Sequence, residues 1–406
     1  MGIPAVSIAA PPVAAPTGDS RLPKHFRRIL APIALLCLCT SPLARADATT
    51  RSLMDQVFDA IAYLLPLSVR DADTSSAWDR ELINEKLTVL RQSATALAGH
   101  TKVRGPEFGL LARSFEETVT DIDSSFREEW PTYAYFSLME LTQHCVACHS
   151  QHAAEAQAQF SQRLLARINT DLFDDSELAQ LYVATRQFEA AERTLAHKLL
   201  DPGQDAIDLD IAGVTLDYLQ LAIGVTNTPE QAAALFEKFA KRADTPFYLR
   251  ERMHYWRSCL TTLAPQLASP PTLAKGRALF AHASEGFRGT RDRGPAVDDL
   301  AAAAVLRRFI DGQAEATGPE VAEAYYMLGV IALRTMEPRY SVPEMEILFA
   351  SAIEADPHGP WARPAFLLLE EFGFIRDVPL ARVDAEETSR LLDMAALQKL
   401  SDPKPR

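Results

Sequence analysis

Residues 131–160 read PTYAYFSLMELTQHCVACHSQHAAEAQAQF, and this stretch decides how the first half of the chain folds. Pro131 stands where the first turn of a helix tolerates proline, and apolar residues follow at helical spacing. Within the stretch, Cys145 and Cys148 are three residues apart, and His149 follows directly. Because residues three apart on a helix share a side, the segment predicts a helix that presents two thiols and an imidazole together.

The pattern C-x-x-C-H is the attachment signature of c-type haem. Each thiol can reach one vinyl group of the same porphyrin, and His149 then supplies the proximal iron ligand. The other ring nitrogen of this histidine needs a hydrogen-bond acceptor that fixes the ring. We therefore predict one covalent haem c, with Cys145 and Cys148 as the thioether residues, and we predict no catalytic residues.

Two other chemistries use the same residue types. A zinc site would take Cys145, Cys148 and two of His144, His149 and His152, which crowds four ligands into one or two helical turns. A thioredoxin-like redox pair needs a strand–helix–strand context, and no such pattern is visible in the sequence. The pattern therefore favours haem over both alternatives.

Three amphipathic segments precede this helix, at about residues 50–67, 79–98 and 106–128. Their apolar residues recur every three or four positions, as in helices that bury one face. Short connections join all four segments, and such helices pack as antiparallel neighbours. The sequence thus predicts an all-α protein whose residues 47–168 form a four-helix bundle.

A four-helix bundle of this length with C-x-x-C-H in its last helix resembles the class II cytochromes c, the cytochrome c′ and c-556 group, over about residues 47–155. The resemblance implies that a residue early in the first helix covers the distal face of the haem. Met54 stands at that position and would be the sixth iron ligand. Family members usually carry a basic residue where this chain has Ala153, so the haem propionates would be held differently, by Arg51 or Lys102.

Other interpretations of the distal side stay open at this point. Met54 is alternatively an ordinary core methionine, because methionine fills irregular gaps between helices. His100, His152 and Met139 are weaker candidates for the sixth ligand. The last two lie on the helix of His149 itself, which makes the opposite haem face hard to reach.

The second half of the chain changes to pairs of shorter helices. Residues 176–182 and 186–191 alternate small and large apolar positions as a tetratricopeptide unit does. Similar patterns recur at Ala232 and Phe236, at Gly276 and Phe280, and at Tyr325, Leu328, Gly329 and Phe349. We predict a tetratricopeptide-like solenoid over residues 169–400, with an exposed loop at 284–297 and a disordered tail at 401–406; a generic helical domain is the alternative.

Residues 1–46, at the beginning of the chain, carry the features of a secretory signal peptide in the usual sequence. Basic residues precede a short apolar run at 29–39, and Ala44-Arg45-Ala46 forms a cleavage motif. The run is too short for a comfortable membrane span, although an uncleaved anchor is the alternative. We therefore predict a periplasmic protein without a membrane span after cleavage. Cys259 is then left over as a buried bystander or as the site of an intermolecular disulfide.

The formal net charge of −13 argues against nucleic acid and anionic membranes as partners. Such a surface suits a basic protein partner, although solubility alone also accounts for it. Homo-oligomerisation stays open.

Together these features predict a monohaem electron-transfer cytochrome that docks a redox protein partner through its helical repeats. One alternative is a protein that binds or senses nitric oxide or carbon monoxide, if Met54 is core and the iron is open. The other is a haem-containing scaffold or assembly protein. An enzyme is not expected, because only one C-x-x-C-H is present and no other catalytic constellation stands out.

Overall fold

The computed structural model describes the following residues: 42–68, 79–99, 106–127, 138, 141, 144, 145, 149, 165, 166, 168–286, 293–313, 317–335, 342–376 and 394–402. These residues form helices and their connections, and no strand occurs among them. The predicted all-helical class is confirmed for this part of the chain. By its contacts the chain divides into Met1–Ala48 and Thr49–Arg406, and the interactions below lie within the second unit.

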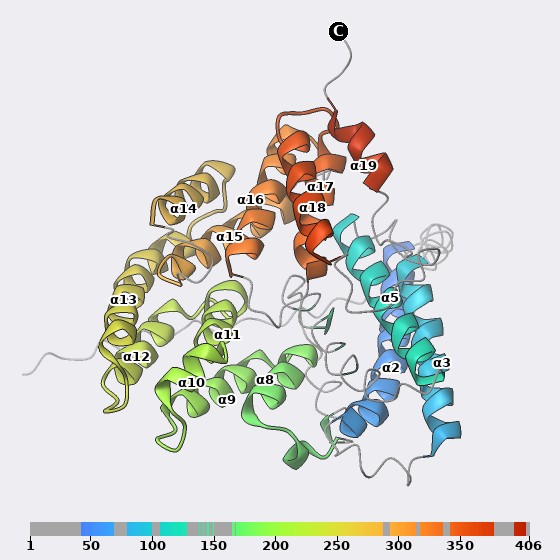
Figure 1. Cartoon of the computed structure of the whole chain (residues 1–406), viewed down its shortest axis with the longest axis horizontal. Helices are drawn as coiled ribbons and strands as arrows, with labels where there is room; N and C mark the ends of the chain where they lie inside the picture. Colours follow the sequence, from blue (N-terminus) through green and yellow to red (C-terminus); the bar gives the residue numbers. More distant parts are fainter. Residues whose placement is uncertain are drawn as a thin grey trace, which may run out of the picture. The chain divides into compact units, whose positions relative to one another are not determined.

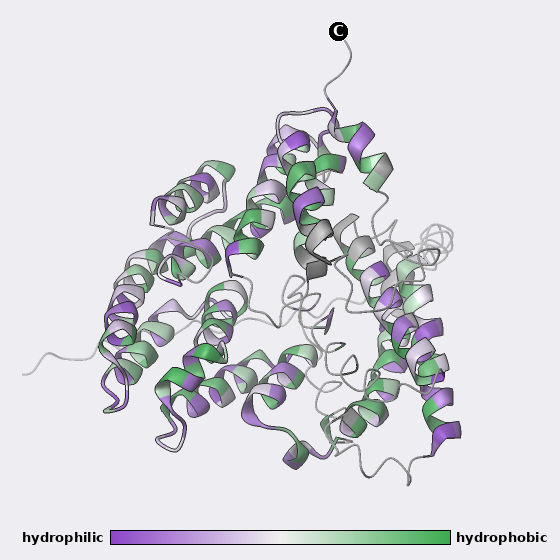
Figure 2. Cartoon of the chain, viewed as in Figure 1, coloured by the Kyte–Doolittle hydropathy of each residue, from purple (hydrophilic) through white to green (hydrophobic). Residues whose placement is uncertain are grey.

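The three predicted amphipathic segments form α2 (Pro42–Ser68), α3 (Arg80–Gly99) and α5 (Pro106–Arg127). Each carries both apolar and polar residues (Figure 2). Asp79 explains where α3 begins, because its carboxylate accepts from the backbone N–H of Leu82 at 3.1 Å. The helix α3 packs along α5 (Figure 1).

The predicted fourth helix is described at five positions, and all five are helical: Leu138, Leu141, His144, Cys145 and His149. Leu138 and Leu141 are buried in an apolar cluster with the three preceding helices. We call this cluster the first core, and its main residues are Val57, Ile61, Leu64, Leu87, Leu90, Val119, Ile122, Leu138 and Leu141. Leu138 and Leu141 therefore share one core with α2, α3 and α5.

The rest of the chain is built of helices that pack in consecutive pairs (Figure 1). The pairs are α8 (Asp175–Ala184) with α9 (Phe188–Leu200), α12 (Pro229–Ala240) with α13 (Phe247–Ala268), α14 (Leu273–Gly286) with α15 (Ala296–Asp311), and α16 (Pro319–Thr335) with α17 (Val342–Ala355). The remaining elements of this part are η4 (Thr170–Leu172), α10 (Ala206–Ile211), α11 (Val214–Gln220), η5 (Leu221–Val225), α18 (Ala362–Arg376) and α19 (Met394–Ser401).

These helices share a larger apolar cluster, which we call the second core. Its main residues are Leu195, Leu199, Phe236, Phe239, Trp256, Leu306, Tyr325 and Phe349. Small residues let paired helices approach, since a Cβ added at Gly329 would lie 2.6 Å from the Phe349 ring. A Cβ added at Gly276 would lie closer still to the Leu306 side chain. Glycine at these two positions is a packing requirement of the helix pairs.

The helix α8 belongs to both cores. Its Leu181 is buried in the first core, whereas its Ala179 is buried in the second. The helix α5 also contributes to the second core, because its Leu111 is buried there, and α5 packs against α17. The two halves that the sequence suggested as separate domains are therefore joined by shared apolar packing.

The prediction of an exposed loop at 284–297 is wrong at both ends. Residues 284–286 belong to the end of α14, and residues 296–297 belong to the start of α15. The residues just before α15 are held by hydrogen bonds. The indole N–H of Trp256 donates to the carbonyls of Arg293 at 3.0 Å and Gly294 at 3.1 Å. The Arg293 guanidinium also donates to the buried Asp210 carboxylate at 3.2 Å. The glycine and arginine that suggested solvent exposure instead hold this segment in place.

The predicted disordered tail begins too early. Ser401 ends α19 and is buried, and its hydroxyl donates to the carbonyl of Gln398 at 2.9 Å. The backbone N–H of His358 donates to the carbonyl of Leu400 at 2.7 Å. Residues 403–406 lie outside the described residues.

Candidate functional site

The imidazole of His149 is held by a backbone carbonyl. Its Nδ1 lies 2.6 Å from the carbonyl oxygen of Ala184, the last residue of α8. Because a carbonyl only accepts, Nδ1 carries the proton in this bond, and in the neutral imidazole the lone pair is then on Nε2. This is the tautomer that an Nε2 iron ligand requires. The sequence indicated that an acceptor was needed, and the structure supplies one 35 residues further along the chain.

The C-terminus of α8 explains why this carbonyl points to the histidine. The last four carbonyls of a helix have no partners within the helix. Those of Leu181, Tyr182 and Val183 are used in the following turn, by the backbone N–H groups of Thr185 at 3.0 Å, Gln187 at 2.7 Å and Arg186 at 2.9 Å, respectively. The fourth carbonyl, that of Ala184, accepts from His149.

The turn after α8 is fixed by backbone geometry and by one hydroxyl. Arg186 has a φ of 57°, in the left-handed region that ends many helices. The Thr185 hydroxyl is buried and lies 2.9 Å from the Leu181 carbonyl and 3.1 Å from that of Tyr182. These bonds hold the peptide of Ala184 at the end of the helix.

Cys145 lies one turn before His149 and is half-buried. Its Sγ is 3.8 Å from the Leu141 carbonyl of the preceding turn, and its side chain packs against the first core. Met54 of α2 is also half-buried and packs against the same core. A thiol and a thioether thus border the first core, and the imidazole of His149, one turn after Cys145, is held by the end of α8. This donor set fits a c-type haem.

Several predicted residues lie outside the described residues. Cys148, the second thiol of the motif, is one of them, and so are His100, Met139, His152 and the propionate candidate Lys102. Arg51, the other propionate candidate, is described and exposed.

His144 has a role that the motif does not reveal. It is buried, and its Nε2 lies 2.9 Å from the hydroxyl oxygen of Thr118 on α5. Since that hydroxyl donates its proton to the Ser114 carbonyl at 3.1 Å, Nε2 must be the donor to Thr118. The ring also meets Phe115 edge-on, with ring centroids 6.2 Å apart. His144 therefore ties the motif helix to α5.

The burial of His144 determines its charge. Loss of hydration lowers the pKa of this imidazole from 6.5 to about 4, so the ring is neutral near pH 7. A neutral donor that is engaged with Thr118 is a structural group. This arrangement weakens the zinc alternative, in which His144 was one of the possible ligands.

Cys259 of α13 is half-buried and packs against the second core. Burial raises the pKa of its thiol, and the nearby carboxylate of Asp298 acts in the same direction. A thiol whose pKa is raised holds little of the reactive thiolate near neutral pH. These surroundings favour the buried bystander over the intermolecular disulfide.

Two features are absent from the described ranges. No group of three or more His, Cys, Asp or Glu side chains there is arranged to hold a metal ion. No helix among these ranges combines the length and the apolar character that a membrane span requires.

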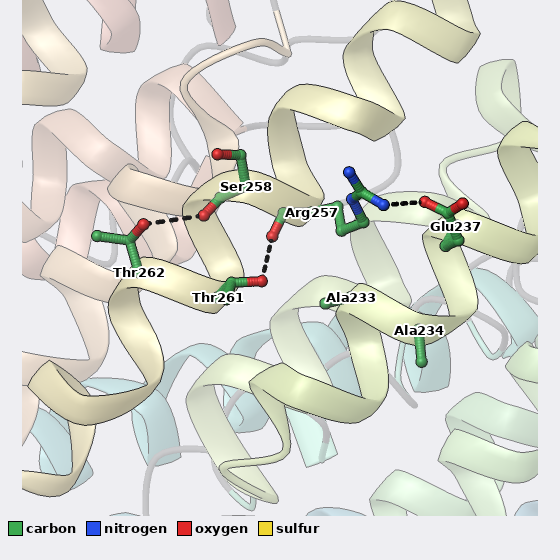
Figure 3. Close-up of a pocket in the computed structure, with 7 residues that line it drawn as sticks. All are labelled: Ala233, Ala234, Glu237, Arg257, Ser258, Thr261 and Thr262. Carbon is green, nitrogen blue, oxygen red and sulfur yellow. Dashed lines mark hydrogen bonds and ion pairs between the residues drawn. The ribbon is translucent and has the colours of Figure 1, made fainter.

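A surface pocket of about 490 Å³ lies between α12 and α13, away from the motif (Figure 3). Its lining residues are Ala233, Ala234, Glu237, Arg257, Ser258, Thr261 and Thr262. Arg257 forms an ion pair with Glu237, and the hydroxyls of Thr261 and Thr262 donate to carbonyls one turn back, at 2.9 and 3.0 Å. Arg257 and Glu237 are thus paired with each other, and the two threonine hydroxyls are bonded to the backbone of α13.

Comparison with protein-family models, with curated proteins and with solved structures found no significant match to this chain. The function is therefore inferred from the residues of the site.

Proposed function

We propose that this chain is an exported monohaem c-type cytochrome that transfers electrons to or from a protein partner. The observation that carries the proposal is the imidazole of His149, which belongs to C-x-x-C-H and donates from Nδ1 to the Ala184 carbonyl at 2.6 Å. That bond leaves the lone pair on Nε2, as a proximal iron ligand requires.

Each residue then has a defined part. Cys145 and Cys148 would hold the haem through two thioether links, and His149 would bind its iron. Met54, which borders the same core as Cys145, is the proposed distal ligand. Haem held in this way supplies a one-electron couple, and methionine ligation raises its potential.

The finer architecture belongs to the same proposal. Helices α2, α3 and α5 with the motif helix would form a class II cytochrome-like bundle, and the later pairs a tetratricopeptide-like solenoid. The close approach of Gly329 to Phe349 supports the second assignment, because small-to-large packing between paired helices is typical of such repeats. Stacked pairs create extended surfaces for partners, and the net charge of −13 suits a basic redox partner in the periplasm.

The test is expression of the full chain in a bacterium with a haem-attachment system. We expect haem that stays bound after denaturation in the wild type and in Cys259→Ser, which is the matched control. The double variant Cys145→Ser with Cys148→Ser is expected to contain none. Covalent haem in that double variant, or its absence from the wild type, would refute the proposal.

Gas binding is the second candidate, because Met54 packs against the first core as an ordinary core methionine also would. The absorption spectrum separates the two. A low-spin spectrum that is lost in Met54→Ala supports electron transfer with Met54 as ligand. A high-spin wild-type spectrum that changes on addition of carbon monoxide supports gas binding instead.

A further inference from the structure

We propose that Thr185 is a positioning residue for His149, so that the turn after α8 tunes the reduction potential of the haem from outside the bundle. This inference rests on the proposed function. It assigns a role to a segment that lies beyond the motif and beyond the four bundle helices.

The first step concerns the electrons of the imidazole. The Ala184 carbonyl lies at the C-terminus of α8, where the helix carries partial negative charge. A short hydrogen bond from Nδ1 to such an acceptor increases the electron density on Nε2. An electron-rich ligand favours the ferric state over the ferrous state, so this bond lowers the reduction potential.

The second step concerns the position of the carbonyl. Thr185 is only 3% exposed, and its hydroxyl is within hydrogen-bonding distance of two carbonyls of α8. The side-chain amide of Gln187 donates to the same hydroxyl at 3.3 Å. Valine has nearly the same shape as threonine but makes none of these bonds. Thr185→Val should therefore loosen the turn and weaken the bond to His149 without opening a cavity.

The third step connects this turn to the second half of the chain. Leu181 of α8 is buried in the first core, whereas Ala179 is buried in the second core. The Lys198 ammonium of α9 donates to the Ser176 hydroxyl at the start of α8, at 2.9 Å. A change in the paired helices that displaces α8 therefore also displaces the acceptor of His149.

The experiment measures the potential of haem-loaded full-length protein by spectroelectrochemistry. Thr245→Val is the matched control. Thr245 lies in the turn after α12 and is 2% exposed, and its hydroxyl donates to the Phe239 carbonyl at 2.8 Å. We expect both variants to lose similar stability in urea. Only Thr185→Val should raise the potential, by about 59 mV if the preference for ferric iron falls about tenfold.

A second readout does not use the haem. In apoprotein with ¹⁵N-labelled histidine, the ring nitrogens of His149 should report protonation at Nδ1 in the wild type and in Thr245→Val, and a mixture of tautomers in Thr185→Val. Equal potentials in the two variants, or an unchanged tautomer in Thr185→Val, would overturn this inference while the cytochrome assignment stands. A wild-type chain that takes up no haem would refute the proposed function itself.

Discussion

Acid should destabilise this protein through His144, and the size of the effect follows from its burial. Loss of hydration lowers the pKa of this imidazole from 6.5 to about 4 in the folded chain. Between these values the unfolded chain binds a proton that the folded chain excludes, so stability falls as the pH falls from 6.5 towards 4. Each pKa unit corresponds to about 1.4 kcal/mol, which gives about 3 kcal/mol at most.

The assay is urea unfolding of the apoprotein, followed by circular dichroism at pH 7 and at pH 4.5, for the wild type and His144→Gln. We expect the variant to be less stable at pH 7, because glutamine packs less well beside Phe115. Between pH 7 and pH 4.5 the free energy of unfolding of the variant should fall by about 2 to 3 kcal/mol less than that of the wild type. His197→Gln is the control, since that imidazole is 78% exposed. If His144→Gln and wild type lose the same stability in acid, the reasoning is refuted.

Two further predictions concern the second half of the chain. Gly329→Ala should lower the free energy of unfolding in urea by about 1–3 kcal/mol, because its Cβ would meet the Phe349 ring at 2.6 Å. Gly224→Ala is the control and should lower it far less, because nothing lies within 4 Å of a Cβ added there. Equal losses in the two variants would contradict this packing. Burial raises the pKa of Asp299 to about 6 despite the Arg334 guanidinium at 3.2 Å. The folded chain then keeps a proton that the unfolded chain releases, so this carboxyl makes stability fall as the pH rises from 4 to 6, and titration of its carboxyl resonance near pH 4 would contradict the prediction.

The local features of the fold could be predicted from the sequence. The helices α3 and α5 begin and end within one residue of their expected bounds, because their apolar spacing and their first residues, Asp79 and Pro106, are properties of short segments. Leu181 and Ala179 could not be assigned to different cores in this way. Which helices share a core is decided by contacts between distant segments, and no short pattern encodes them.

The candidate site could be predicted only where the type and spacing of its residues form a recognisable motif. Cys145, Cys148 and His149 follow from the spacing of the motif. The acceptor at Ala184 has no signature, because every residue carries a carbonyl and only the end of α8 leaves this one available. His144 does have a signal, since it follows the buried Leu141 by three positions on the same helix, which places a polar ring on a buried face.

The carbonyl that holds His149 also has a consequence for the order in which the chain folds. Chains emerge from the ribosome N-terminus first, so the imidazole emerges before Ala184, which follows it by 35 residues. The bond between them cannot form until α8 has emerged and its last turn has closed. There is thus an interval, before α8 has folded, in which the imidazole of His149 is not held by this carbonyl. Haem attachment in that interval would precede the locking of its own ligand, and α8 would act as the final step of maturation.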